Sequence, residues 1–288
     1  MTATPPSERP FEPLPEGTGV DAFGLTHMGK VRATNADSFL VMRLSRSMQV
    51  EGTNLPLEHV TPARGGYLFL VADGVGTGRG GEMASEKAAH SLASYVSSCA
   101  NTYFAQQNHD DAKCVADLLQ GVRQVHQEVR TEAEREGRPG AATTLTLVVL
   151  FWPKAYLVHV GDSRAYRLRD NRLELLSHDQ TVAQALVDAG ALTASKGEIS
   201  PLKHILTSAI GAEEATPEVQ VDTARPDDVL LLCTDGLTKH VTEAELEATL
   251  REGQAAEPTV RRLVDLALER GGSDNVTVVV VKAGTRSN

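Results

Sequence analysis

The sequence predicts an α+β fold in which antiparallel β-sheets carry helices on their outer sides. Segments with the length and composition of strands come in groups joined by tight turns, and the long helical segments come in pairs. A doubly wound parallel fold would instead alternate strand and helix along the chain. We find no internal repeat and no long linker in the 288 residues. We therefore expect one domain over residues 18–284, between short tails at 1–17 and 285–288.

The first part of the chain predicts two strands among irregular segments. Residues 1–17 contain five prolines and few residues that could pack, so we expect this tail to be mobile. Strands are predicted at 20–24 and 38–44, on either side of a connecting segment at 26–37. Residues 45–64 are polar and include two prolines, which indicates an excursion loop.

A buried strand and two long helices are predicted next. Residues 67–72 are all apolar or aromatic, and they are followed by Asp73 and Gly74. A run this short and this apolar is typical of a buried strand. Gly74 would let the backbone turn sharply at the strand end and expose its carbonyl group. A glycine-rich turn at 74–81 then leads to two helices, at residues 82–97 and 112–136.

The second half of the chain begins with a strand meander. Strands are predicted at 144–151, 155–161, 165–168 and 173–176, and Asp170-Asn171 supplies the turn residues of a hairpin. A helical insertion follows, with its first helix near 181–190. A strand is then predicted at 229–233, shortly before Asp235-Gly236. Two helices, at 243–251 and 258–270, and a last strand at 276–282 complete the chain.

Composition excludes several classes of function. The formal net charge of -10 argues against nucleic acid or an anionic membrane as a partner. The three cysteines are odd in number and widely spaced, which fits free thiols in a reducing compartment. No apolar run reaches the roughly 18 residues of a membrane span, and the N-terminal residues do not form a secretory signal. We expect a cytoplasmic protein.

Five aspartates lie at predicted strand ends, far apart in the sequence. A single Asp-Gly pair after a strand is usually a turn, but five such positions predict that folding assembles one metal site. Oxygen ligands without a His or Cys cluster favour Mg²⁺ or Mn²⁺ over Zn²⁺. A pair of such ions about 3.5–4 Å apart is an arrangement that hydrolyses phosphate esters. The five residues are Asp37, Asp73, Asp162, Asp235 and Asp274.

Arg32 is the cation that stands out near these acids, because it precedes Asp37 by five residues. A planar guanidinium can hold two phosphate oxygens at once, which a lysine does less well. The nine histidines show no spacing typical of metal ligands, and we interpret His159, His178 and His204 as structural.

Three rival motifs fail in their context. Residues 24–30 match a P-loop, but Val31 stands where the metal-binding hydroxyl is required. Residues 76–81 contain G-x-G-x-x-G, but a second helix follows where a dinucleotide site needs a strand, so nucleotide binding at this turn stays a minor alternative. Residues 161–165 lead into a strand and not into the helix of a nucleophile elbow. Cys233 lacks the arginine six positions later that a thiolate phosphatase needs, since residue 239 is Lys.

Six stretches, taken together and in this order, resemble the metal-dependent serine/threonine protein phosphatases of type 2C in their compact bacterial form. The resemblance covers about residues 20–283. The stretches are 29–38 with Arg32, Asn35 and Asp37; 71–76 with Asp73 and Gly74; 142–145 with Thr143 and Thr144; 159–164 with Asp162 and Arg164; 233–237 with Asp235; and 271–277 with Asp274 and Asn275.

The resemblance implies two stacked antiparallel sheets with a helix pair on each outer face, and a flap at about residues 178–204. It also implies two Mn²⁺ or Mg²⁺ ions and a third ion that binds more weakly. The implied roles are a bridge between two ions for Asp73, a carbonyl ligand from Gly74, ligands of the other ion from Asp235 and Asp274, direct or water-mediated support from Asp37, a third site from Asp162 with Asp235, and substrate phosphate binding by Arg32.

The implied activity is hydrolysis of phosphoserine and phosphothreonine by a water that the two ions activate. The partners would be phosphorylated proteins and a cognate Ser/Thr kinase, and we expect a monomer. The chain departs from the family pattern at three positions: Ala36 where an acidic or amide side chain is common, Val75 where animal relatives have a His, and Gln180 in place of a His. Ala36 keeps a second alternative open, a pseudophosphatase that binds phosphoproteins without cleaving them.

Overall fold

The computed structural model describes residues 20–45, 65–77, 79–105 and 110–283. The tails expected at 1–17 and 285–288, and residues 46–64 of the expected loop, lie outside the described residues. None of the helices in the described part of the chain combines the length and the apolar character that a membrane span requires.

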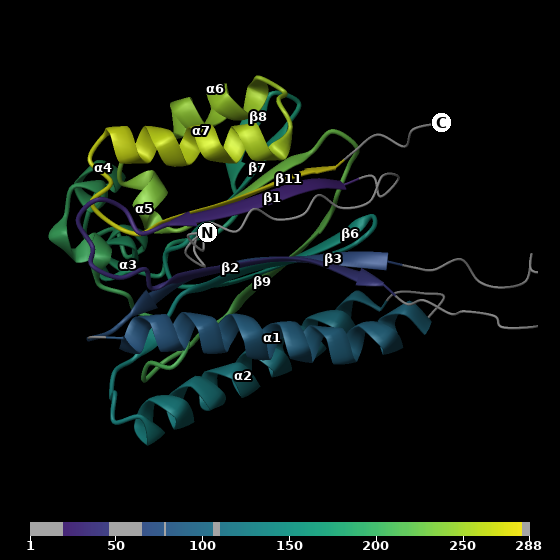
Figure 1. The fold of residues 1–288 in the computed structure, drawn as a ribbon, viewed down its shortest axis with the longest axis horizontal. Coiled ribbons are helices and arrows are strands. Elements are labelled where there is room, and N and C mark those ends of the chain that lie inside the picture. Colours follow the sequence, from purple (N-terminus) through teal and green to yellow (C-terminus); the bar gives the residue numbers. More distant parts are fainter. Residues whose placement is uncertain (1–19, 46–64, 78, 106–109, 284–288) are drawn as a thin grey trace, which may run out of the picture.

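Two antiparallel sheets stack face to face and form the centre of the molecule (Figure 1). One has the strand order β1-β11-β10-β7-β8. The other has the order β2-β3-β5-β6-β9, and β4 pairs with the end of β3. The strands are β1 (Val20–His27), β2 (Asp37–Ser45), β3 (Gly65–Val75), β4 (Ala142–Thr143), β5 (Leu145–Phe151), β6 (Lys154–Val160), β7 (Arg164–Arg169), β8 (Arg172–Leu175), β9 (Glu218–Thr223), β10 (Val229–Cys233) and β11 (Val276–Ala283).

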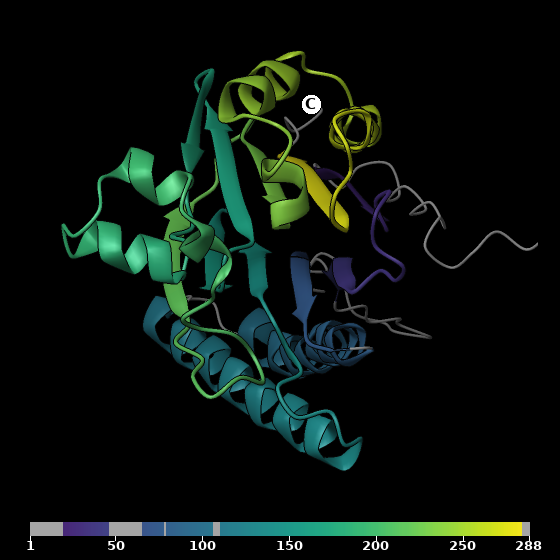
Figure 2. The same ribbon diagram turned by 90° about the vertical axis from the view of Figure 1, so that its left-hand side faces the viewer.

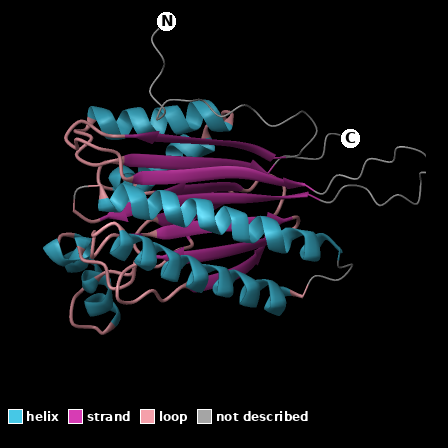
Figure 3. Cartoon of the chain, turned by 60° about the horizontal axis from the view of Figure 1, so that its bottom comes forward, coloured by secondary structure: helices cyan, strands magenta, loops and turns pink. Residues whose placement is uncertain are grey.

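A pair of helices covers the outer face of each sheet, as the sequence and the family resemblance predicted (Figure 3). Helices α1 (Gly80–Ala105) and α2 (Asp111–Arg135) pack on the sheet that contains β3. Helices α6 (Glu243–Arg251) and α7 (Ala256–Glu269) pack on the sheet that contains β10 and β11. The predicted α+β fold class is therefore confirmed.

The apolar runs in the sequence follow from this layering. Phe69 and Val71 of β3 face Leu232 of β10 and Val279 of β11 in the core between the sheets. Neighbouring residues of the same strands point outward and are covered by the helices. A strand that is buried on both faces has no polar side, so β3, β5 and β11 are nearly continuous apolar segments in the sequence.

The predicted hairpin turn is present between β7 and β8. Asp170 and Asn171 have φ values of 51° and 60°, and both residue types tolerate this left-handed conformation better than most. The three cysteines are free thiols, as the sequence predicted.

The prediction for the end of β3 was wrong in one respect. The strand does not end at Asp73 but continues through Gly74 to Val75, because these two residues pair with Thr143 and Ala142 of β4. Helix α1 also begins two residues earlier than expected and extends further, to Ala105.

Several short elements were not predicted. Strand β9 is an edge strand with mostly exposed residues, so it lacks the apolar run that marks the other strands. Between β8 and β9 the chain forms three short helices that stand beside the end of the sheets (Figure 2). The first of them, α3 (Val182–Asp188), is the helix expected near 181–190, whereas α4 (Ala194–Glu198) and η3 (Pro201–His204) were not predicted. A fourth short helix, α5 (Asp235–Thr238), follows β10 and was not predicted either.

Candidate metal centre

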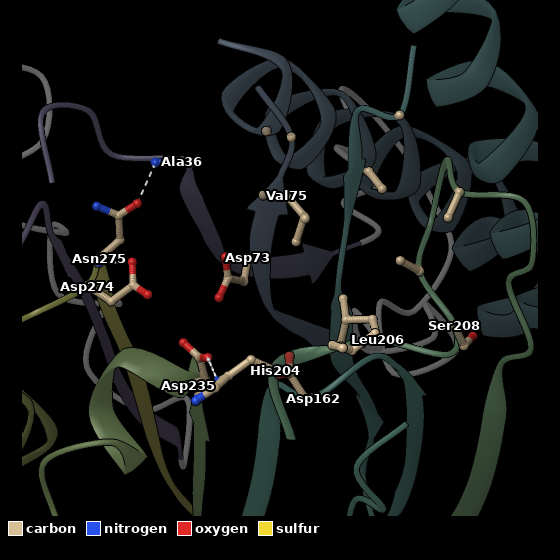
Figure 4. A pocket seen from close by; sticks show the side chains of 18 of the residues that line it. Ala36, Asp73, Val75, Asp162, His204, Leu206, Ser208, Asp235, Asp274 and Asn275 are labelled. Carbon is tan, nitrogen blue, oxygen red and sulfur yellow. Dashed lines mark hydrogen bonds and ion pairs between the residues drawn. The ribbon is translucent and has the colours of Figure 1, made fainter. Parts of the chain in front are cut away.

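A cavity of about 1130 Å³ opens at one end of the stacked sheets. Four of the five predicted aspartates line it, together with Arg32 and Gly74, and one wall comes from the segment 204–214. Figure 4 shows the carboxylates of Asp73, Asp235 and Asp274 turned toward the same open space. These three residues come from different strand ends: Asp73 lies in β3, Asp235 follows β10, and Asp274 precedes β11.

The fifth aspartate, Asp37, lies directly opposite Asp73 in the β2–β3 ladder. Asp37 is buried, and its Oδ2 accepts hydrogen bonds from the hydroxyls of Thr234 at 2.8 Å and Thr277 at 2.6 Å. Its Oδ1 has no hydrogen-bond partner among the described residues. Asp37 therefore joins the two sheets beside the cavity without lining it.

Gly74 occupies a position that admits no side chain. A Cβ atom there would lie 2.1 Å from the Gly81 carbonyl oxygen and 2.6 Å from the Ala36 carbonyl oxygen, both backbone atoms. The main-chain N–H of Gly74 donates to Ala36 at 3.1 Å. Glycine is required at position 74 because three backbone segments approach closely there. The sharp turn that the sequence predicted is not the reason, since β3 continues to Val75.

Two basic side chains neutralise one side of the acidic cluster. Arg32 donates to Asp274 through Nε at 2.6 Å and Nη2 at 2.8 Å. Lys239 Nζ lies 2.6 Å from Asp235 Oδ2 and 2.7 Å from Asp274 Oδ2. The other oxygen of Asp235, Oδ1, is buried and has no hydrogen-bond partner in the part of the chain that the structure describes.

Asn275 holds the loop that carries Arg32. Its side-chain amide donates to the carbonyl oxygens of Met28 at 2.8 Å and Thr34 at 2.9 Å, and its Oδ1 accepts from Ala36 N–H at 2.9 Å. These three bonds close residues 28–36 against the start of β11. Arg32, which is 57% exposed, is thereby placed beside Asp274.

Gln180 anchors the turn that presents Asp162. Its Oε1 accepts from the Gly161 N–H at 3.0 Å, and its main-chain N–H donates to the Gly161 carbonyl at 2.7 Å. Its Nε2 donates to the carbonyl of Thr216 at 2.9 Å. Gly161 has φ 106°, a conformation that favours glycine. The residue that departs from the family pattern therefore still supports this turn.

Burial and mutual repulsion favour protonation of the aspartates that have no basic partner. Burial raises the pKa of Asp37 to about 7. Burial raises the pKa of Asp73 well above its usual value, and the negative charge of Asp37 adds to this effect. Burial and the charge of Asp235 raise the pKa of Asp162 to about 7. Burial alone would raise the pKa of Asp274 too, but hydrogen bonds from Arg32 and Lys239 lower it to about 2.

These residues fit a divalent metal site. Two carboxylates directly opposite on paired strands repel each other, and two buried carboxylate oxygens have no hydrogen-bond partner within residues 20–45, 65–77, 79–105 and 110–283. A hard cation that takes oxygen ligands would relieve both. In the described segments no three acidic, His or Cys side chains converge closely enough to hold one ion alone. Main-chain carbonyl oxygens and water would have to complete each coordination shell, as is usual for Mg²⁺.

The sequence predicted no role for two residues of the cavity that lie beside Asp235. His204, interpreted as structural, lines the cavity with Nδ1 3.9 Å from Asp235 Oδ2. Lys239 also lines the cavity, and the sequence pattern predicts no role for it beyond the lack of an arginine at this position. Its spacing of four from Asp235 was the available signal, because residues four apart on a helix lie on the same side. By contrast His159 is buried and bonded to Thr146 and Gly161, as a structural residue would be.

Comparison with known protein families matches residues 58–276 to the model of protein phosphatase 2C. The chain belongs to the protein phosphatase 2C family. The resemblance drawn from six short motifs is therefore confirmed.

Bacterial serine/threonine phosphatases are among the relatives of this family member. PstP of Mycobacterium tuberculosis is 34% identical over 217 residues, which cover 75% of this chain and 40% of PstP. The phosphatase stp of Listeria monocytogenes is 31% identical over 220 residues, which cover 75% of this chain and 84% of stp. The match thus spans 40% of the length of the mycobacterial relative.

Solved structures agree with the fold. The crystal structure of M. tuberculosis PstP has a TM-score of 0.74 and 31% identity, and the match covers 92% of this chain and 99% of that chain. A crystal structure of the PstP catalytic domain in complex with two manganese ions has a TM-score of 0.72 and 30% identity, with 92% and 99% coverage.

Proposed function

We propose that this chain is a metal-dependent serine/threonine protein phosphatase that hydrolyses phosphoserine and phosphothreonine in other proteins. The observation that carries the proposal is the gathering of five aspartates from both sheets around one cavity, with two buried carboxylate oxygens left unpartnered. Family membership and the similarity to PstP and stp support the same activity.

The acidic residues would hold two Mn²⁺ or Mg²⁺ ions. Asp73 would serve both ions and the Gly74 carbonyl one of them, while Asp235 and Asp274 would complete the other. Asp37 would support the pair directly or through water, and Asp162 with Asp235 would hold a weaker third ion. The two manganese ions in the PstP catalytic domain support this proposal. The absence of a side-chain ligand at Ala36 would leave more of the coordination shell to water.

When bound, such a pair of ions activates a water for in-line attack on phosphorus. The contribution of Arg32 would be to hold the substrate phosphate and offset charge on its oxygens. The two hydrogen bonds to Asp274 use two of the five guanidinium N–H donors, so others can reach a phosphate at the cavity that Arg32 lines. Val75, 45% exposed beside Gly74, cannot transfer a proton.

Residues 18–284 would form the catalytic domain, and about 178–204 its flap. His204, at the end of this insertion, lines the cavity, which supports a role of the insertion beside the substrate. We further propose that the protein acts in the cytoplasm as a monomer, without nucleic acid or membrane partners, and opposes a cognate Ser/Thr kinase. The negative net charge and the three free cysteines support this setting.

Asp235→Asn tests the proposed site. We expect this variant to lose Mn²⁺-dependent hydrolysis of p-nitrophenyl phosphate and of a phosphothreonine peptide, with an unchanged circular dichroism spectrum, because it removes one metal-binding carboxylate. Asp170→Asn is the matched control: it makes the same change in an exposed turn where Asn is equally suited.

Activity of Asp235→Asn equal to that of the parent protein would contradict the site assignment. A parent protein that binds the phosphopeptide and Mn²⁺ without turnover would instead be a pseudophosphatase. A chelator added to the parent should abolish turnover.

A further inference from the structure

Asp235 and Asp274 already hold a cation that belongs to the chain. Lys239 Nζ lies 2.6 Å from Asp235 Oδ2 and 2.7 Å from Asp274 Oδ2, and the lysine side chain is only 21% exposed. The two carboxylate oxygens therefore converge on one point, as they would on a shared metal ion. The ammonium group occupies that point.

Asp274 has no acceptor position left for a metal ion. An ionised carboxylate offers about four lone-pair sites. Its Oδ1 accepts from Arg32 Nε at 2.6 Å and from the main-chain N–H of Asn275 at 3.0 Å. Its Oδ2 accepts from Arg32 Nη2 at 2.8 Å and from Lys239 Nζ at 2.7 Å. One of these donors must leave before Asp274 can bind a metal ion.

Lys239 is the donor best able to leave. The Asn275 N–H belongs to backbone that the Asn275 side chain ties to residues 28–36. Arg32 is held by two parallel hydrogen bonds. Lys239 gives Asp274 a single bond from a flexible four-carbon stem, and its charge is strongly hydrated once released. The cavity that Lys239 lines gives the ammonium room to move away.

We propose that Lys239 is the counter-ion of the metal-free site, and that it competes with a metal ion for Asp235 and Asp274. The inference rests on the proposed function, because it takes these two aspartates as metal ligands. Without metal, the ammonium offsets the repulsion between the carboxylates. When a divalent ion binds, the ammonium must be displaced, so Lys239 weakens the affinity of this ion site.

Calorimetric titration of Mn²⁺ into metal-free protein tests the proposal. Lys239→Met keeps the length of the side chain and removes its charge, and we expect Mn²⁺ to bind at least about ten-fold more tightly. The same variant without metal should unfold at a lower temperature than the parent, because the two carboxylates lose their counter-ion. Lys239→Gln, which also removes the charge but keeps a hydrogen-bond donor, should shift the affinity in the same direction. It provides the test if the Met variant folds poorly.

Lys154→Met is the matched control. It removes the same charge and an ion pair of similar length, Lys154 Nζ to Asp111 Oδ2 at 2.7 Å, at the opposite end of β6 from Asp162. Its Mn²⁺ affinity should stay within about two-fold of the parent, because the distant charge is screened.

An affinity that is unchanged or weaker in both Lys239 variants would overturn the proposal, and a weaker one would make Lys239 a support of the metal site. These results differ from failure of the proposed function, in which the parent protein itself binds no Mn²⁺. The inference would then be wrong as well.

Discussion

Asp37 and Asp73 are placed where a sheet would ordinarily avoid two acids. They form a cross-strand pair, and like charges in such a pair destabilise a sheet. The threonine hydroxyls at Asp37 Oδ2 offset part of this cost, but Oδ1 is left without a donor. A site that is unfavourable when empty and favourable with a cation is typical of a metal-binding centre.

The stability of the metal-free protein should therefore fall as the pH rises. The pKa values of Asp37 and Asp162, raised to about 7, and the raised pKa of Asp73 mean that the folded state binds more protons than the unfolded state above the usual Asp pKa. Where the folded state binds more protons, the free energy of unfolding decreases with pH. We expect the Tm of chelator-treated protein to fall between about pH 5 and pH 8, by roughly 2–4 °C for each kcal/mol lost.

Asp274 does not contribute in this window, because its lowered pKa of about 2 affects stability only in more acidic solution. Saturating Mn²⁺ should reverse the trend, since the ion binds the ionised carboxylates and so binds more tightly as the pH rises. Thermal unfolding at several pH values, with chelator or with Mn²⁺, measures both effects. A Tm without metal that rises steadily from pH 5 to pH 8 would contradict the assignment of these pKa shifts.

At the scale of single elements, the end of β3 determines the geometry of the site. Asp73 and Gly74 lie where β3 is paired with β2 on one side and β4 on the other. The Asp73 N–H donates to Thr144 Oγ1 at 2.9 Å, and Thr143 Oγ1 donates to the Asp73 carbonyl at 2.9 Å. The strand end is thus held on both sides, and the start of α1 closes against Gly74.

Gly74→Ala should disrupt this strand end. The added Cβ would meet backbone oxygens of Gly81 and Ala36, which cannot rotate away. We expect a loss of about 1–3 kcal/mol in the free energy of unfolding, typical of overpacking, and weaker Mn²⁺ binding. Chemical denaturation and calorimetry provide the two measurements.

Gly65→Ala is the comparison variant at the other end of the same strand. Its Cβ would lie 3.2 Å from the Leu44 carbonyl oxygen, a contact that a small shift relieves. Its stability should stay within about 1 kcal/mol of the parent, because alanine is otherwise the better strand residue. Equal effects of the two substitutions would show that close packing at Gly74 is unimportant.

At the scale of the whole molecule, the candidate metal centre lies across both sheets. Asp37 and Asp73 belong to the sheet of β2 and β3, while Asp235 and Asp274 flank β10 and β11 of the other sheet. Ions bound by both sets of residues would link the sheets at one end of the molecule, in addition to the apolar core between them.

Metal binding should therefore stabilise the whole fold. At about 100 times its Kd, Mn²⁺ adds about 2.7 kcal/mol to the free energy of unfolding, which raises Tm by roughly 5–10 °C. Differential scanning calorimetry with Mn²⁺ and with a chelator measures the difference. The increase should be much smaller in Asp235→Asn, and an equal increase in this variant would place the stabilising ion elsewhere.

The sequence by itself determined the fold class, most of the elements and the five aspartates, because these features are written in local patterns. A nearly continuous apolar run marks β3 and β11, and Asp170-Asn171 marks the turn between β7 and β8. An acidic residue at the end of such a run is likewise visible in the sequence. Edge strand β9 and the one-turn helix α5 escaped prediction, because neither buries enough apolar surface to leave such a pattern.

Only the tertiary structure decided which residues meet. Asp37 and Asp73 lie opposite each other only because of the strand register. The hydrogen bonds of Asn275 to residues 28–36 join segments about 240 positions apart. The same holds for Lys239, whose ammonium reaches Asp274 only because α5 and the start of β11 pack together. A carboxylate can be recognised from the sequence, but which cation pairs with it depends on distances that only the folded chain defines.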